Sequence, residues 1–147
     1  MRADQPPVVV ESQLPVSAER VWDALTDPAQ MRQWFFDNIP DFKPQVGFQT
    51  QFDVATPKRV FPHRWQVTRV APGQLLELRW NYEGYPGDAT VEFTLQPSDQ
   101  GCTLRVNCTV LEDFPDDIPE FRRESCVDGW TYLLQQSLPD FLSEPQD

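Results

Sequence analysis

The chain has 147 residues, a length that fits one domain and can bury a sizeable core without disulfides or structural metals. Its formal net charge is −11 and its basic residues are mostly scattered singly, so we expect neither nucleic acid nor an anionic membrane surface as a partner. No apolar run approaches the roughly 18 residues of a membrane-spanning helix, and the N-terminal residues lack the apolar core of a signal peptide. We therefore expect a soluble, cytoplasmic protein without membrane insertion.

The N-terminal part of the chain predicts one strand followed by two short helices. Val8–Leu14 is rich in β-branched residues, which is typical of a strand. Ser17 is a good N-cap for a helix over 18–26, while Asp27 and Pro28 offer a cap and a first residue for a second helix. The apolar face of that second helix would consist of Met31, Trp34 and Phe35.

The middle of the chain predicts strands in which every second residue is apolar. A loop over 38–44 precedes them, and the turns between them are short, so successive strands should pair antiparallel in a meander. One face of this sheet would be wet, and the other must be covered. The residues of the expected inner face are Val46, Phe48, Thr50 and Phe52; Trp65 and Val67; Leu76, Leu78, Trp80 and Tyr82; Val91, Phe93 and Leu95; and Leu104, Val106, Cys108 and Val110.

The C-terminal segment Phe121–Leu142 predicts one long amphipathic helix. A helix of roughly 20 residues spans about 30 Å, the width of a small domain. Its start carries the residues of a capping box, with Asp117 as the cap, Pro119 at the first helical position and Glu120 three residues after the cap. The apolar stripe that should face the sheet consists of Cys126, Trp130, Leu133, Leu134, Leu138 and Phe141.

The end of this helix and the fold class follow from the same pattern. Pro139 should kink or end the helix near Leu138, which would leave residues 139–147 as a loosely held tail. The helix has the length and the stripe to cover the apolar face of the sheet. We therefore predict an α+β fold in one domain, residues 1–147, with a curved antiparallel sheet of six to seven strands wrapped on a long C-terminal helix.

Four segments carry a resemblance to a known family: VSAERVWDALTDPAQMRQWF at 16–35, QVTRVAPGQLLELRW at 66–80, VEFTLQPSDQGCTLRV at 91–106 and CVDGWTYLLQQSL at 126–138. With the order of the elements, they resemble the homologues of the activator of the ninety-kilodalton heat-shock protein ATPase, in the START-like, birch-pollen-allergen-like (SRPBCC) superfamily. The resemblance implies a helix-grip fold with a seven-stranded sheet, often with an apolar cavity under the helix. It implies no shared reaction, because members include co-chaperone domains, lipid carriers and cyclases.

We find no constellation of residues that predicts catalysis, a metal site or a cofactor. His63 is the single histidine, and its neighbours suggest a strand start near a sheet rim, where it would be solvated or structurally bonded. Cys102 and Cys108 lie roughly 20 Å apart on one strand and cannot pair with each other, so we expect buried, reduced thiols. The acidic run over 112–124 lacks the pattern of a calcium loop and would complement the dipole of the following helix.

The candidate site is the surplus of aromatic residues on the expected inner face. Such rings either interdigitate to fill a core or line a cavity, and the sequence leaves both alternatives open. Polar groups that could orient a ligand are Tyr82, Arg79, Arg105 and Asp128. The candidate ligand-binding residues are Trp65, Trp80, Tyr82, Phe93, Trp130 and Phe48.

We predict a non-catalytic domain that binds a small apolar or amphipathic ligand between sheet and helix. A cavity below about 100 Å³ would contradict this prediction. One alternative, from the resemblance, is a co-chaperone-type module that acts on the ninety-kilodalton chaperone, although we expect this chain to be without the separate N-terminal domain of the eukaryotic co-chaperone. Another is a cyclase or dehydratase with His63, Asp128 or Tyr82 as its acid–base residue. The oligomeric state is open.

Overall fold

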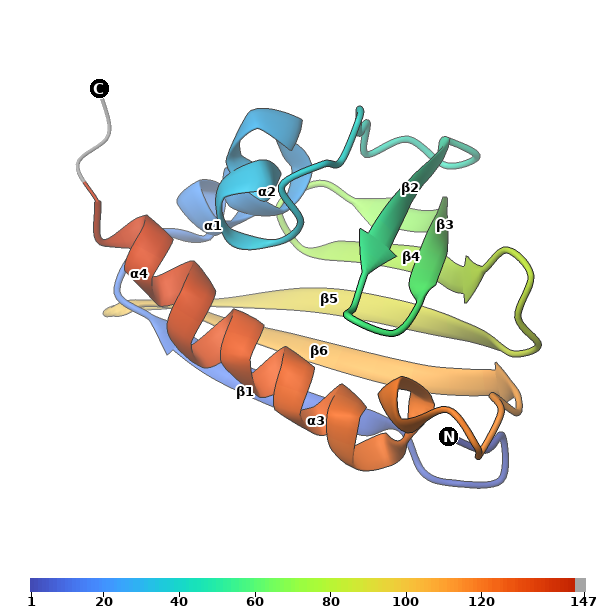
Figure 1. The fold of residues 1–147 in the computed structure, drawn as a ribbon. Helices are drawn as coiled ribbons and strands as arrows, with labels where there is room; N and C mark the ends of the chain where they lie inside the picture. The colour runs from blue at the N-terminus through green and yellow to red at the C-terminus, as the bar shows by residue number, and fades with distance from the viewer. Residues whose placement is uncertain (145–147) are drawn as a thin grey trace.

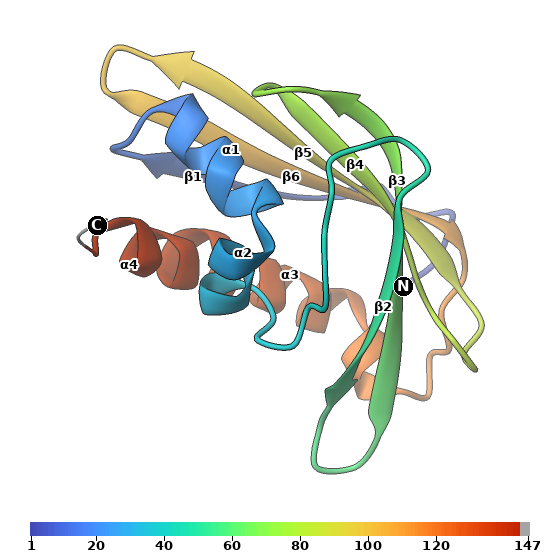
Figure 2. The ribbon, with the colours of Figure 1, turned by 90° about the horizontal axis from the view of Figure 1, so that it is seen from above.

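A curved antiparallel sheet grips the C-terminal helix in the computed structural model, which describes residues 1–144 (Figure 1). The sheet has six strands among these residues, in the order β1-β6-β5-β4-β3-β2, and Figure 2 shows how it bends around the helix. The predicted α+β helix-grip fold is confirmed, with six strands and not the seven that the resemblance implies. The strands are β1 (Val8–Leu14), β2 (Gln49–Ala55), β3 (Val60–Ala71), β4 (Leu75–Tyr82), β5 (Asp88–Ser98) and β6 (Gly101–Glu112).

The two short helices after β1 form as predicted, α1 over Ala18–Thr26 and α2 over Pro28–Trp34. The Ser17 side chain accepts a hydrogen bond from the backbone N–H of Arg20, and Asp27 caps α2 in the same way through the N–H of Ala29. These caps satisfy amides that have no partner inside the helix. The Ser137 hydroxyl donates to the carbonyl oxygen of Trp34 at 2.7 Å, which ties α2 to the C-terminal helix.

The C-terminal helix begins later than the sequence predicts. A single 3₁₀ turn, η1 (Pro119–Phe121), precedes α3 (Arg123–Tyr132), and neither has a side-chain cap. The predicted capping box is therefore wrong. The reason is that the Glu120 carboxylate binds the Arg59 guanidinium at 2.9 Å and the Thr56 hydroxyl at 3.1 Å, so it is not available to cap its own helix.

Pro139 does not end the helix. One π-helical turn, η2 (Leu133–Ser137), links α3 to α4 (Leu138–Leu142), and the Leu138 N–H binds the Leu133 carbonyl five residues back. Proline lacks an N–H and clashes with the carbonyl four residues back, and the wider π turn relieves both effects. The predicted loose tail is wrong for residues 139–142, because Phe141 and Leu142 are buried. Residues 145–147 of that tail lie outside the described residues.

The inner face of the sheet and the helix stripe form one hydrophobic core. Register places large side chains opposite one another, with Trp65 paired to Trp80 and Phe93 to Val106. The expected inner-face residues of β3 to β6 lie in this core or pack against it. Before β3, Phe52 is buried and Phe48 packs against the core, whereas Val46 is 69% exposed because β2 begins only at Gln49, after the turn at Gly47.

Candidate functional site

A cavity of about 190 Å³ lies between the inner face of the sheet and the first turns of α3. Its volume exceeds the limit of about 100 Å³ set above and the ~150 Å³ of an engineered cavity that holds benzene, but is below the ~300 Å³ of a typical ligand pocket. The space fits one small ring. Its lining includes His63 on β3, Trp80 and Tyr82 on β4, Cys108 on β6, and Cys126 and Trp130 on α3.

Three of the six predicted ligand-binding residues line this cavity: Trp80, Tyr82 and Trp130. The Trp80 indole N–H donates to the Tyr82 hydroxyl oxygen at 2.9 Å, and the Trp80 and Trp130 ring centroids lie 5.6 Å apart in an edge-on arrangement. Removal from water raises the pKa of Tyr82, so its hydroxyl stays protonated at neutral pH. The cavity therefore has an aromatic wall with one fixed hydroxyl.

The other three predicted residues do not reach the cavity. Trp65 and Phe93 are buried in the other half of the space under the helix, and Phe48 packs on Phe42 with ring centroids 5.8 Å apart. Phe35, the residue after α2, is partly buried and packs against the rings of that half. Its ring centroid lies 5.3 Å from that of Trp65, 6.4 Å from that of Phe93 and 5.8 Å from that of Trp130. Both alternatives of the sequence are thus realised, a packed half and a hollow half.

His63 is buried within β3 and not solvated at a rim, which corrects part of the prediction. It is structurally bonded, since Nδ1 donates to the carbonyl oxygen of Phe61 at 2.9 Å. Burial lowers the pKa of His63 to about 4, so the ring is neutral at pH 7. The strand alternation that places Trp65 and Trp80 inside also places His63 inside, and this signal was present in the sequence.

The polar groups expected to orient a ligand, apart from Tyr82, lie elsewhere. Arg79 binds Asp88 at 2.7 Å on the outer face, Arg105 binds Glu11 at 2.6 Å there, and Asp128 is exposed. Both arginines alternate with inward-facing neighbours, so their outward position follows from strand period. The polar groups that the prediction missed are the thiols of Cys108 and Cys126, which line the cavity.

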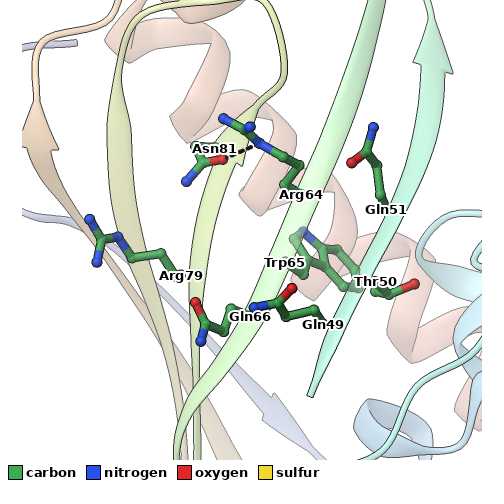
Figure 3. A pocket seen from close by; sticks show the side chains of 8 residues that line it. All are labelled: Gln49, Thr50, Gln51, Arg64, Trp65, Gln66, Arg79 and Asn81. Carbon is green, nitrogen blue, oxygen red and sulfur yellow. Dashed lines mark hydrogen bonds between the residues drawn. The ribbon is translucent and has the colours of Figure 1, made fainter. Parts of the chain in front are cut away.

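A second hollow, of about 500 Å³, lies on the outer face of β2, β3 and β4 (Figure 3). Two rows of long polar side chains cross the three strands there, and the Arg64 Nε–H donates to the Asn81 amide oxygen at 2.7 Å. Burial favours a raised pKa for Asp88 at its edge, but hydrogen bonds from Arg79 and Asn81 outweigh this and hold the pKa below its usual value. The wet lining makes this hollow a poor apolar site. The two rows are Gln49, Gln66 and Arg79, and Gln51, Arg64 and Asn81.

The sheet, the gripped helix and the cavity between them define a START-like helix-grip protein. Residues 15–143 match the family model described as "Activator of Hsp90 ATPase homolog 1-like protein", and the chain belongs to that family. No curated protein matches the chain by sequence. This family and this fold support a ligand-binding domain in general terms. Among residues 1–144, no helix combines the length and the apolar character needed to cross a membrane.

Three solved structures illustrate the likeness. Protein CV1439 from Chromobacterium violaceum has a TM-score of 0.78 at 22% identity, over 96% of this chain and 99% of that chain. Protein MLL2253 from Mesorhizobium loti has a TM-score of 0.73 at 28% identity, with the same coverage of 96% and 99%. DynU16, from the dynemicin biosynthetic locus, has a TM-score of 0.74 at 24% identity, over 94% of this chain and 47% of that chain. At such identities these likenesses chiefly describe the fold.

Proposed function

We propose that this chain is a non-catalytic binding domain that holds a small apolar or amphipathic molecule, about the size of one substituted aromatic ring, in the cavity under α3. The observation that carries the proposal is the cavity itself, with a volume of about 190 Å³ and walls that include Trp80 and Trp130. Aromatic walls favour a flat ring, since edge-to-face pairs add about 0.5–1.5 kcal/mol each beyond burial. A long lipid would need a larger space.

The polar groups of the cavity favour a ligand with one polar end. The Tyr82 hydroxyl oxygen accepts from Trp80, and its O–H can also donate to a ligand. In the neutral ring of His63, Nδ1 carries the hydrogen and donates it to the Phe61 carbonyl oxygen. Nε2 therefore has no hydrogen and can accept a hydrogen bond. A phenol satisfies both requirements, because its O–H can donate to His63 or accept from Tyr82.

The enzyme alternative finds weaker support. A histidine with a pKa of about 4 is a poor base at neutral pH, and a tyrosine with a raised pKa is a poor acid. Asp128 is exposed on the helix surface and does not line the cavity. These groups provide hydrogen bonds for binding more readily than proton transfer.

The family match keeps a second candidate, a module that acts on a ninety-kilodalton chaperone. Its test is an ATPase assay of the chaperone with saturating domain, after a pull-down with the immobilised chain. Unchanged turnover at saturation would remove this candidate, and a change that survives the cavity variant described next would separate it from ligand binding.

The binding proposal is tested with p-cresol and toluene by saturation-transfer NMR and by thermal shift. We expect both probes to bind, and p-cresol to bind more tightly because it satisfies Tyr82 or His63. Ala89→Leu should abolish binding, because Ala89 is buried at the cavity and the larger side chain occupies part of its volume. The matched control is Thr90→Leu, the next residue of β5, which faces the other side of the sheet and should bind both probes like the unaltered chain. Absence of binding in the unaltered chain contradicts the proposal.

A further inference from the structure

Two thiols that are 18 residues apart in the sequence meet in the cavity. Cys108 lies on the inner face of β6 and is buried, while Cys126 lies in the first turns of α3 and is only partly buried. Both line the cavity, and the strongest influence on the pKa of each is the thiol of the other. Cys102, on the same face of the same strand, lines no part of this cavity.

The surroundings make the two thiols unequal. The hydrogen bond from the Cys108 thiol holds the pKa of Cys126 below its usual value, and the Arg123 guanidinium in the preceding turn of α3 adds to this effect. The same hydrogen bond, together with burial, raises the pKa of Cys108 well above its usual value. Cys126 is thus the better nucleophile, and Cys108 keeps its proton until it reacts.

We propose that Cys126 and Cys108 form a hydroperoxide-reactive pair, in which Cys126 is oxidised first and Cys108 then converts it to a disulfide that joins α3 to β6. A low-pKa, accessible thiol beside a second thiol is the usual arrangement of a redox-sensitive cysteine. The cavity supplies the space for a small hydroperoxide at the Cys126 sulfur. The proposal does not depend on the ligand proposed above.

The chemistry balances with one hydroperoxide per pair. The Cys126 thiolate attacks the terminal peroxide oxygen, the O–O bond breaks, and the leaving oxygen takes a proton to become water or an alcohol. The Cys126 sulfenic acid that results is attacked by the Cys108 sulfur, which loses its proton to the departing hydroxide. An S–S bond forms, the S–O bond breaks and water leaves, so two thiols lose two electrons and the hydroperoxide gains them.

The disulfide would also change the cavity. Disulfide sulfurs lie about 2 Å apart, closer than two thiols in hydrogen-bonding contact, so the first turns of α3 must approach β6. That end of α3 has no side-chain cap and is held from outside the helix, because Arg123 donates to the Pro6 carbonyl oxygen at 2.7 Å. The oxidised chain should therefore have a smaller cavity and a helix fixed at both ends.

The test is treatment of the reduced, folded chain with hydrogen peroxide, followed by peptide mass spectrometry. We expect an intramolecular link between the Cys108 and Cys126 peptides with the loss of two hydrogens and of two titratable thiols. Cys108→Ser should stop at a Cys126 sulfenic acid that a dimedone reagent traps, and Cys126→Ser should leave Cys108 reduced. Cys102→Ser is the matched control and should behave like the unaltered chain.

A second measurement needs no variant. Iodoacetamide labelling of the unaltered chain should modify Cys126 at least about tenfold faster than Cys102, and 6 M urea should remove the difference. Equal labelling of these two cysteines in the folded chain would overturn the proposal. So would peroxide treatment that yields links only between molecules, or no link at all.

Discussion

The two halves of the space under the C-terminal helix differ although one sheet and one helix enclose both. In the half next to α1 and α2, Phe35 and its neighbouring rings fill the space. In the half next to the first turns of α3, a cavity of about 190 Å³ remains. Phe36 lies at the boundary, with its ring centroid 4.8 Å from that of Phe35 and 5.1 Å from that of His63.

Aromatic residues on the inner face of the sheet are therefore not sufficient to form a pocket. The space between sheet and helix is packed where an element other than these two adds an aromatic ring. Here the end of α2 adds Phe35 to one half only. In the other half, Phe114 and Phe121 from the connection between β6 and α3 line the cavity and leave its space unfilled. Substitutions and titrations in each half can test this contrast.

The largest effect is expected in the packed half, from Trp65→Ala. Trp65 is 2% exposed and its ring contacts Phe52 and Trp80 at centroid distances of 4.8 and 5.0 Å, so its loss should reduce the free energy of unfolding by about 3–5 kcal/mol. Urea denaturation measures this loss. Trp65→Phe is the control and should lose much less, because the Trp65 indole N–H donates to no acceptor among residues 1–144. A small loss for the alanine variant would show that this half is not tightly packed.

In the hollow half, His63 makes stability depend on pH. Its pKa is lowered from 6.5 to about 4 on folding, so the stability of its neutral form is fully present above pH 6.5 and is lost as the pH falls towards 4. The contribution is about 3 kcal/mol at most. Urea titrations at pH 7 and pH 4.5 should show this fall for the unaltered chain and a smaller fall for His63→Phe. An equal fall in the two proteins would assign it to carboxylates instead.

Phe35→Leu should convert part of the packed half into cavity. Removing the ring should reduce the free energy of unfolding by about 1–2 kcal/mol and extend the space beyond Phe36. The variant should bind 2-naphthol several-fold more tightly than the unaltered chain in saturation-transfer NMR. Phe42→Leu removes a ring that packs on Phe48, away from the cavity, and serves as the control with a similar loss of stability and no gain in binding. If both variants gain equally, Phe35 does not divide the space.

The smallest effect is a gain in stability at the cavity mouth. An added Cβ at Gly129 of α3 would have no heavy atom within 4 Å outside its own helix, so Gly129→Ala should raise the free energy of unfolding by about 1 kcal/mol through helix propensity. Gly73→Ala also meets open space but has φ +77°, and it should lose about 1 kcal/mol. Thermal denaturation of the two variants checks the opposite signs. A loss at Gly129 would mean that the mouth is not open.

The candidate site was only partly predictable. Strand alternation placed Trp80 and Tyr82 on the inner face, and helical spacing placed Trp130 opposite them, so these three cavity residues follow from local periodicity. The same rule includes Trp65 and Phe93, which are packed by Phe35. No local pattern shows that the residue after α2 turns into the space under a helix about 100 residues later in the chain.

Three features could be predicted from local periodicity and short connections. They are an antiparallel meander, two capped short helices and a C-terminal helix whose apolar stripe must cover the sheet. These features depend on neighbours in the chain, so the order of residues contains them. Tertiary structure alone decided which rings fill space and which enclose it, that Glu120 bonds to Arg59 instead of capping its helix, and that Cys108 and Cys126 line one cavity. Those outcomes depend on distances between segments far apart in sequence, which only the packed chain defines.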